Sequence, residues 1–221
     1  MTIQPATLSH AEDIARLIMM AMTDDCCQNL AGAEHTLDDF ARVMLSLVRA
    51  EHTQYSYRNA LVALTPDGSV AGACVGYRGE DLHALREAFI SAARQHFGID
   101  YTDMADETRP GEYYIDSLAV YPEYRRQGIA TALLRAATDH AHSIGLPAAL
   151  LVDKGNPSAR RLYESVGFVA AGDDTWGGHA MTRMMKPISR PYHRHTDKDF
   201  CRNRLATMAF FAIFVIHTTY L

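Results

Sequence analysis

The sequence has few cysteines, and their spacing excludes several kinds of site. Four cysteines occur in 221 residues: Cys26 and Cys27 are adjacent, whereas Cys74 and Cys201 are isolated. No Cys-x-x-Cys pair is present, so we expect neither a disulfide framework nor a zinc site, and no bound metal. Such sparse thiols are typical of a reducing compartment, and we therefore expect a cytoplasmic protein.

The sequence also has little positive charge and no long apolar stretch. Lys and Arg number 21 against 26 Asp and Glu, which gives a net charge of −5. That balance lacks the basic character of a nucleic-acid-binding protein. The longest strongly apolar run, Met208–Ile216, is much shorter than the ~20 residues of a membrane-spanning helix, and residues 1–5 lack the basic start of a secretory signal. Only that run supports a membrane-associated protein, which is the least favoured interpretation.

Hydropathy patterns predict one α/β domain that begins at the N-terminus. Hydrophobic residues make up 48% and charged residues 21% of the chain, as in globular proteins. Apolar spacing at helical period predicts helices, and short apolar runs bounded by turn residues predict strands. A capping box, Ser9 to Glu12, is expected to start the first helix. The predicted strands are 3–7, 60–64, 70–77, 113–120, 148–152, 168–170 and 179–186; the predicted helices are 9–22, 36–48, 81–97, 126–143 and 157–166.

The end of the chain differs in character. Residues 187–221 contain two prolines, a stretch rich in Arg and His, and then the apolar run. We expect a domain over residues 1–187 and an appendage of unknown role over 188–221. The apolar run would pack either on the domain or on a second chain, which leaves a homodimer open.

A helix start with small residues follows the strand at 113–120. The sequence there is Arg125-Arg126-Gln127-Gly128-Ile129-Ala130. The first N–H groups of a helix lack intrahelical partners, and small residues let an anion approach them. The segment therefore fits a pyrophosphate-binding turn. An ordinary loop with solvated arginines is the alternative that spacing alone leaves open.

At this point the sequence resembles a known family. Arg125-x-x-Gly128-x-Ala130 is similar to the acetyl-CoA signature of the GNAT superfamily of N-acetyltransferases. A second similar segment, Asn156-Pro157-Ser158-Ala159 with Tyr163 and Gly167-Phe168, follows in the family's order. The resemblance covers about residues 1–187. It implies an α/β (α+β) fold: a mixed, mostly antiparallel, twisted sheet of six to seven strands flanked by helices, with a splayed parallel strand pair at the CoA site.

The resemblance also implies roles for particular residues. Tyr163 would stand near the sulfur of CoA and protonate the leaving thiolate. Asn156 and Ser158 would contact the CoA arm. Main-chain groups of residues 118–120 would pair with the pantetheine, and backbone amides of residues 125–131 would hold the pyrophosphate. The cofactor-binding set is thus Leu118, Ala119, Val120, Arg125, Arg126, Gln127, Gly128, Ile129, Ala130, Thr131, Asn156, Ser158 and Tyr163.

Asp116 is the candidate general base. Strand alternation would place Tyr114, Asp116 and Leu118 on one face, next to the expected thioester. A buried carboxyl with a raised pKa suits a base. A structural aspartate is the alternative, and the Tyr114 phenol is another candidate participant.

These residues predict an N-acetyltransferase that moves the acetyl group of acetyl-CoA directly to a primary amine. The alternative is a non-catalytic module of the same fold that binds or senses acyl-CoA. The acceptor is not readable, but residues 23–34, 81–111 and 173–178 are expected to shape its site. Acidic residues there would suit a cationic amine or be solvated loop charge: Asp24, Asp25, Asp38, Asp39, Asp103, Asp106 and Glu107. Trp176 is interpreted as a loop anchor, with a substrate platform as the alternative.

Overall fold

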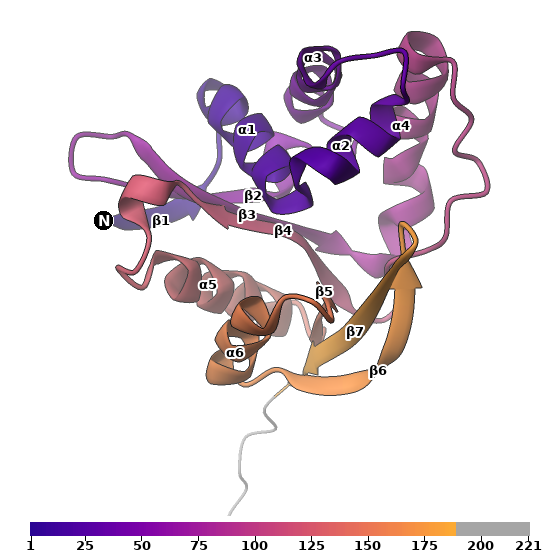
Figure 1. Ribbon diagram of the computed structural model, residues 1–221. Coiled ribbons are helices and arrows are strands. Elements are labelled where there is room, and N and C mark those ends of the chain that lie inside the picture. The colour runs from indigo at the N-terminus through magenta and orange to yellow at the C-terminus, as the bar shows by residue number, and fades with distance from the viewer. Residues whose placement is uncertain (189–221) are drawn as a thin grey trace, which may run out of the picture. The chain divides into compact units, whose positions relative to one another are not determined.

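The computed structural model describes residues 1–188, so the predicted appendage and its apolar run lie outside the described residues. One mixed sheet of seven strands, in the order β1-β2-β3-β4-β5-β7-β6, runs through the molecule (Figure 1). Neighbouring strands are antiparallel except β4 and β5, which are parallel. The predicted fold class is confirmed. The strands are β1 (Thr2–Pro5), β2 (Ala60–Leu64), β3 (Val70–Arg78), β4 (Tyr113–Val120), β5 (Ala148–Asp153), β6 (Val169–Trp176) and β7 (His179–Lys186).

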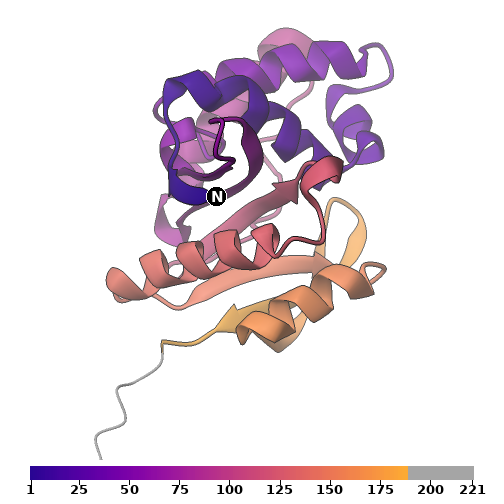
Figure 2. The same ribbon diagram turned by 90° about the vertical axis from the view of Figure 1, so that its left-hand side faces the viewer.

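Helices cover both faces of the sheet and divide the core in two (Figures 1 and 2). The first four helices pack on one face around Phe40, Met44 and Phe89, and the last two pack on the other face around Leu133, Leu134 and Phe168. The helices are α1 (Ala11–Met22), α2 (Asp24–Ala31), α3 (Leu37–Arg49), α4 (Leu82–Phe97), α5 (Ile129–Ser143) and α6 (Pro157–Val166).

Three local predictions were wrong. The capping box before α1 is formed by Thr7 and His10, whose ring Nδ1 accepts from the Thr7 N–H at 3.1 Å, and not by Ser9 and Glu12. The segment 23–34, predicted as a connection between the helices at 9–22 and 36–48, contains α2, whose short and polar sequence hides its helical period. Strand β6 continues to Trp176, so the turn after it is only Gly177-Gly178.

Two irregularities of β4 shape the centre of the molecule. Strand β4 pairs with β5 only at Tyr113 and Tyr114, after which the two strands diverge. On its other side the register shifts, because Gly76 opposes Ile115 while Val75 opposes Ser117. Asp116 is therefore the extra residue of a β-bulge, a feature that re-aims side chains near functional sites.

A glycine makes this bulge sterically feasible. A Cβ atom on Gly76 would lie 2.8 Å from the carbonyl oxygen of Tyr114 and 2.7 Å from the Tyr113 ring. The Tyr113 hydroxyl donates to the Gly76 carbonyl at 2.8 Å and ties the two strands together at this point. Over residues 1–188, none of the helices combines the length and apolarity that crossing a membrane requires.

Candidate active site

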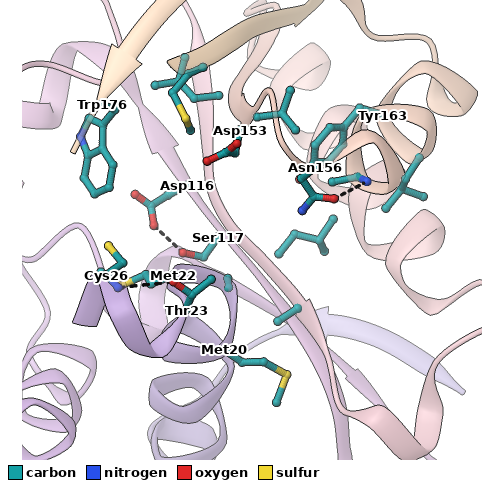
Figure 3. Close-up of a pocket in the computed structure, with 18 of the residues that line it drawn as sticks. Met20, Met22, Thr23, Cys26, Asp116, Ser117, Asp153, Asn156, Tyr163 and Trp176 are labelled. Atoms are coloured by element: carbon teal, nitrogen blue, oxygen red, sulfur yellow. Dashed lines mark hydrogen bonds between the residues drawn. The ribbon is translucent and has the colours of Figure 1, made fainter. Parts of the chain in front are cut away.

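A cavity of about 600 Å³ opens where β4 and β5 diverge. Its walls come from α1, α2, β4, β5, α6 and the β6–β7 hairpin, together with Tyr55 and Glu107 (Figure 3). Eight of the predicted site residues line it: Asp116, Leu118, Ala119, Val120, Arg125, Ala130, Asn156 and Tyr163. The other predicted site residues, Arg126, Gln127, Gly128, Ile129, Thr131 and Ser158, are outside this lining.

The Asp116 side chain points into the cavity because of the β-bulge, and not because of regular strand alternation. Tyr114 packs with Tyr77 and Leu82 on the α4 face, whereas Leu118 packs against the α5 core. The expectation that Tyr114, Asp116 and Leu118 share one face was therefore wrong. The extra residue inverts the alternation, because side-chain direction has a period of two.

The Asp116 carboxyl has an unusual protonation equilibrium. Its Oδ2 lies 2.7 Å from the Ser117 hydroxyl. Burial, together with the nearby Glu107 carboxylate, raises the Asp116 pKa from 3.8 to about 7. The Ser117 hydroxyl, Arg86 and Gln54 oppose this rise without cancelling it. A carboxyl that titrates near neutrality can both take up and release a proton at physiological pH.

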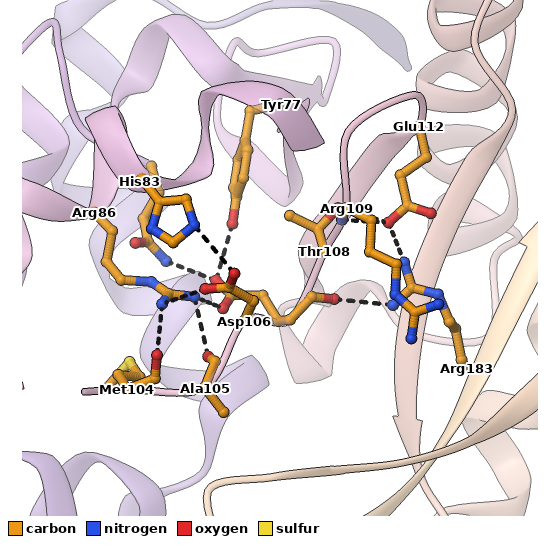
Figure 4. A network of polar contacts seen from close by, with 12 residues as sticks. Tyr77, His83, Arg86, Met104, Ala105, Asp106, Thr108, Arg109, Glu112 and Arg183 are labelled. Atoms are coloured by element: carbon orange, nitrogen blue, oxygen red, sulfur yellow. Dashed lines mark hydrogen bonds and ion pairs between the residues drawn. The ribbon is translucent and has the colours of Figure 1, made fainter. Parts of the chain in front are cut away.

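A buried polar network contains Glu107, which lines the same cavity as Asp116 (Figure 4). Arg86 of α4 forms an ion pair with Glu107, and both side chains are only 4% exposed. Glu107 also accepts from the Tyr77 hydroxyl at 3.0 Å and from Gln54 Nε2 at 3.4 Å. The carboxylate of Glu107 is thus fully engaged. Sequence reasoning missed Arg86, although a charged residue within the apolar stripe of a helix is a usable signal.

A second buried ion pair closes the same loop onto the sheet. Arg183 of β7 pairs with Glu112, and its Nη1 donates to the Glu107 carbonyl at 3.2 Å. The Thr108 hydroxyl donates to Glu112 at 2.6 Å. The loop between α4 and β4 is therefore held from both sides, which fixes Glu107 against the cavity.

The turn before α5 presents free backbone donors. Within the part of the chain that the structure describes, no N–H of residues 126–131 donates to another protein group. Arg126 (φ 63°) and Gly128 (φ 77°) adopt left-handed conformations that shape this turn. Arg125 differs, because its N–H donates to Pro122 at 3.2 Å and its Nε to the Val120 carbonyl at 3.0 Å. Arg125 thus braces the turn against the end of β4.

Two residues of the second motif lie across the cavity from Asp116 (Figure 3). Asn156 caps α6, with its Oδ1 accepting from the Ala159 N–H at 3.0 Å. Tyr163 is half-buried on α6, and burial, with Cys74 as a smaller cause, raises its pKa to about 12. Its hydroxyl contacts no hydrogen-bonding group among residues 1–188. Tyr163 therefore stays protonated at neutral pH and has a hydroxyl to donate.

The structure also places the acidic residues and the tryptophan that were considered for the acceptor site. Of the acidic residues considered for the acceptor site, only Glu107 lines the cavity. Trp176 also lines it, which favours the substrate-platform interpretation over a loop anchor. No group of three or more His, Cys, Asp or Glu side chains within residues 1–188 is arranged to hold a metal ion.

Comparison with known proteins gives the family. Residues 33–168 match the Acetyltransferase (GNAT) family. The chain belongs to the GNAT acetyltransferases. This match contains the bulged β4, the turn before α5 and Tyr163. Acetyl-CoA is the acetyl donor in this family.

Individual relatives agree with this assignment. A crystal structure of an acetyltransferase matches with a TM-score of 0.71 and 29% identity, over 86% of this chain and 100% of that one. The N-acetyltransferase from Staphylococcus aureus Mu50 matches with a TM-score of 0.72 and 24% identity, over 84% and 100%. Mycothiol acetyltransferase of Streptomyces coelicolor is 36% identical over 78 residues, which is 35% of this chain and 25% of that protein. The matched part thus spans a quarter of that curated relative.

Proposed function

We propose that this GNAT protein transfers the acetyl group of acetyl-CoA directly to a primary amine. The observation that carries the proposal is one cavity containing Asp116 and Tyr163, next to the unpartnered amides of residues 126–131. A binding module for acyl-CoA needs the amides but neither of the two titratable groups. The similarity to mycothiol acetyltransferase supports acetyl transfer, and it leaves the acceptor open.

The residues present fit acetyl-CoA as the donor substrate. The amides of residues 126–131 would bind the pyrophosphate, because unpaired N–H groups at a helix start attract anions. The gap between β4 and β5 beyond Tyr114 leaves the edge of β4 at Leu118–Val120 for the pantetheine arm. The Asn156 amide group, whose Oδ1 is used in the cap, would donate its remaining hydrogens to that arm.

The chemistry requires two proton transfers. The amine nitrogen attacks the thioester carbonyl carbon, so a C–N bond forms and the C–S bond breaks. Asp116, as carboxylate, would accept the proton that the amine loses. Tyr163 would donate the proton that the sulfur gains. The raised pKa of Asp116, about 7, suits the first role, and the raised pKa of Tyr163, about 12, keeps the donor protonated.

Placing the two substrates together would supply most of the acceleration. Holding an amine and a thioester in contact converts a bimolecular step into a unimolecular one. No protein nucleophile is needed, because the amine attacks the thioester itself. Cys26 and Cys74 are poor candidates for a covalent intermediate, since burial raises the pKa of both thiols and disfavours the thiolate.

The test is thiol release from acetyl-CoA in the presence of an amine, an alcohol and a thiol as separate acceptors. Release that depends on a primary amine is expected, and the amide should be the product. Tight acetyl-CoA binding by calorimetry with no release for any amine would overturn the transferase and favour the acyl-CoA-binding module.

A further inference from the structure

The cavity has a second half that the CoA motifs do not reach. It is formed by the end of α1, the start of α2, Tyr55, Glu107 and the β6–β7 hairpin. Its apolar wall consists of sulfur-containing and aromatic side chains: Met20, Met22, Cys26, Tyr55, Trp176 and Met181. Such side chains are large and polarisable, and they pack well against flat apolar groups.

The carboxylates that line this half of the cavity differ in how far they are already engaged. Glu107 is paired with Arg86. Both oxygens of Asp153 have neighbours, because Oδ1 accepts from the Gly155 N–H at 2.6 Å and Oδ2 lies 3.3 Å from His179 Nδ1. Asp116 has no Arg, Lys or His partner within residues 1–188 and contacts the Ser117 hydroxyl at 2.7 Å. Asp116 is therefore the carboxylate with most capacity left for a ligand ammonium.

The described lining also offers no place for a ligand carboxylate. Arg125 is the only Arg or Lys side chain in that lining, and it lies in the CoA half. Its guanidinium is already engaged by the Val120 carbonyl at 3.0 Å and the Met20 sulfur at 3.4 Å. An α-amino acid would bring a carboxylate into a half whose uncompensated charge is negative, and like charges repel there.

Trp176 lines the same cavity as Asp116. It ends β6 and pairs with His179 across the Gly177-Gly178 turn. Both glycines have positive φ, as a tight two-residue hairpin requires, so the turn sets the position of Trp176 at the end of its strand. Figure 3 shows the indole and the Asp116 carboxyl at the same opening. The indole Nε1 is buried without a partner among residues 1–188.

We propose that the acceptor is a primary monoamine on a flat apolar body, with the amine placed at Asp116 and the body packed on Trp176. The inference rests on the proposed amine transfer and names its substrate class. Trp176 is then a specificity residue. Polyamines are disfavoured because their second ammonium finds only carboxylates that already have partners, Glu107 and Asp153. The α-amino acids are disfavoured because the one Arg of the described lining already contacts Val120 and Met20.

The binding test uses the fact that Trp176 is the only tryptophan in the chain. Its fluorescence is followed while 2-phenylethylamine is added to the full chain saturated with CoA. A saturable change is expected, with an apparent affinity at least tenfold higher than for spermidine or phenylalanine. Equal or tighter binding of spermidine or phenylalanine would overturn the substrate class, as would the absence of any change with 2-phenylethylamine.

The kinetic test uses two variants of Trp176. Trp176→Ala should raise the KM for 2-phenylethylamine about tenfold, the order expected for a lost aromatic contact, with the KM for acetyl-CoA unchanged. Trp176→Phe retains a flat ring and should recover most of the loss. Equal KM values for the amine in wild type and Trp176→Ala would contradict the specificity role.

The two proposals fail in different ways. Binding of 2-phenylethylamine beside Trp176 without acetylation of any amine would refute amine transfer and leave the ligand class standing. Acetylation of spermidine or phenylalanine with a kcat/KM equal to or above that of 2-phenylethylamine would refute the substrate class and leave amine transfer standing.

Discussion

Replacing Asp116 with Asn should make this acetyltransferase slower and more stable at the same time. Burial raises the pKa of the Asp116 carboxyl from 3.8 to about 7 in the folded protein. The unfolded chain loses this proton near pH 4, whereas the folded protein holds it up to about pH 7. The free energy of unfolding therefore falls as the pH rises between these two values, because the folded state binds more protons there.

The size of this stability gain follows from the pKa shift of Asp116. Each pKa unit corresponds to about 1.4 kcal/mol, so a shift from 3.8 to about 7 sets a ceiling of about 4 kcal/mol. Solvent reaches the half-buried carboxyl, so we expect about 2 kcal/mol at pH 8. For a chain of this length that gain raises Tm by about 4–8 °C. The gain should disappear below about pH 4, where Asp116 is protonated in both the folded and the unfolded state.

The catalytic activity of Asp116→Asn should fall, although its stability rises. In the wild type, kcat/KM should rise through about pH 7 as the Asp116 carboxylate forms. In Asp116→Asn that acidic limb should be flat, and kcat/KM at pH 8 should fall ~10²-fold, as when a general base is lost. Such a trade of stability for function is common at active sites.

The control is Asp139→Asn, which removes an exposed carboxylate from α5 without touching the cavity. It should change neither the acidic limb nor the pH dependence of Tm. Urea unfolding and pH–rate profiles of both variants check these outcomes. An Asp116→Asn protein that is less stable than the wild type at pH 8, or that keeps the acidic limb, would show that Asp116 is neither destabilised by burial nor the general base.

Four further predictions follow from the site and the fold. Tyr163→Phe should lower kcat by ~10²–10⁴ with acetyl-CoA affinity unchanged by calorimetry; wild-type turnover would remove its role as acid. Gly128→Glu should abolish acetyl-CoA binding, whereas Gly128→Ala, which shares the strain of a φ of 77°, should retain part of it; equal affinities would place the pyrophosphate elsewhere. Glu107→Gln removes the buried partner of Arg86 and leaves it only the half-exposed Asp106 carboxylate at 3.1 Å, so it should cost ~1–3 kcal/mol in urea unfolding, and it should shift the acidic limb to lower pH. A chain ending at Ser189 should stay folded and bind acetyl-CoA, and its unfolding would show that the proposed domain boundary at residue 187 is wrong.

Much of the fold was predictable because the sequence patterns were local and strong. The helix that starts at Pro157 and the strand that starts at His179 were predicted with the bounds that the structure shows. The segment at Asp24–Ala31 was not, because half of its eight residues are polar and so short a helix shows too few turns for its period to be detected.

The candidate site was predictable only in part, for a different physical reason. Motif spacing located the turn before α5 and Tyr163. The side-chain direction of Asp116 depends on a bulge whose cause, the close approach of Gly76 to Tyr114 on a neighbouring strand, is a long-range contact. Arg86 could be noticed as a charge within the apolar stripe of its helix, but its partner Glu107 lies 21 residues further along the chain and no local pattern links the two. The bulge and this pairing therefore required the structure.

The most direct test of amine acetylation follows the acetyl group itself. Acetyl-CoA labelled in the acetyl group is incubated with the protein and a mixture of primary amines, and the amines, the protein and free acetate are analysed by mass spectrometry. We predict labelled amide, no label bound to the protein, and loss of most of the amide with Asp116→Asn. Label that accumulates on the protein, or that appears only as free acetate, would contradict direct transfer to an amine.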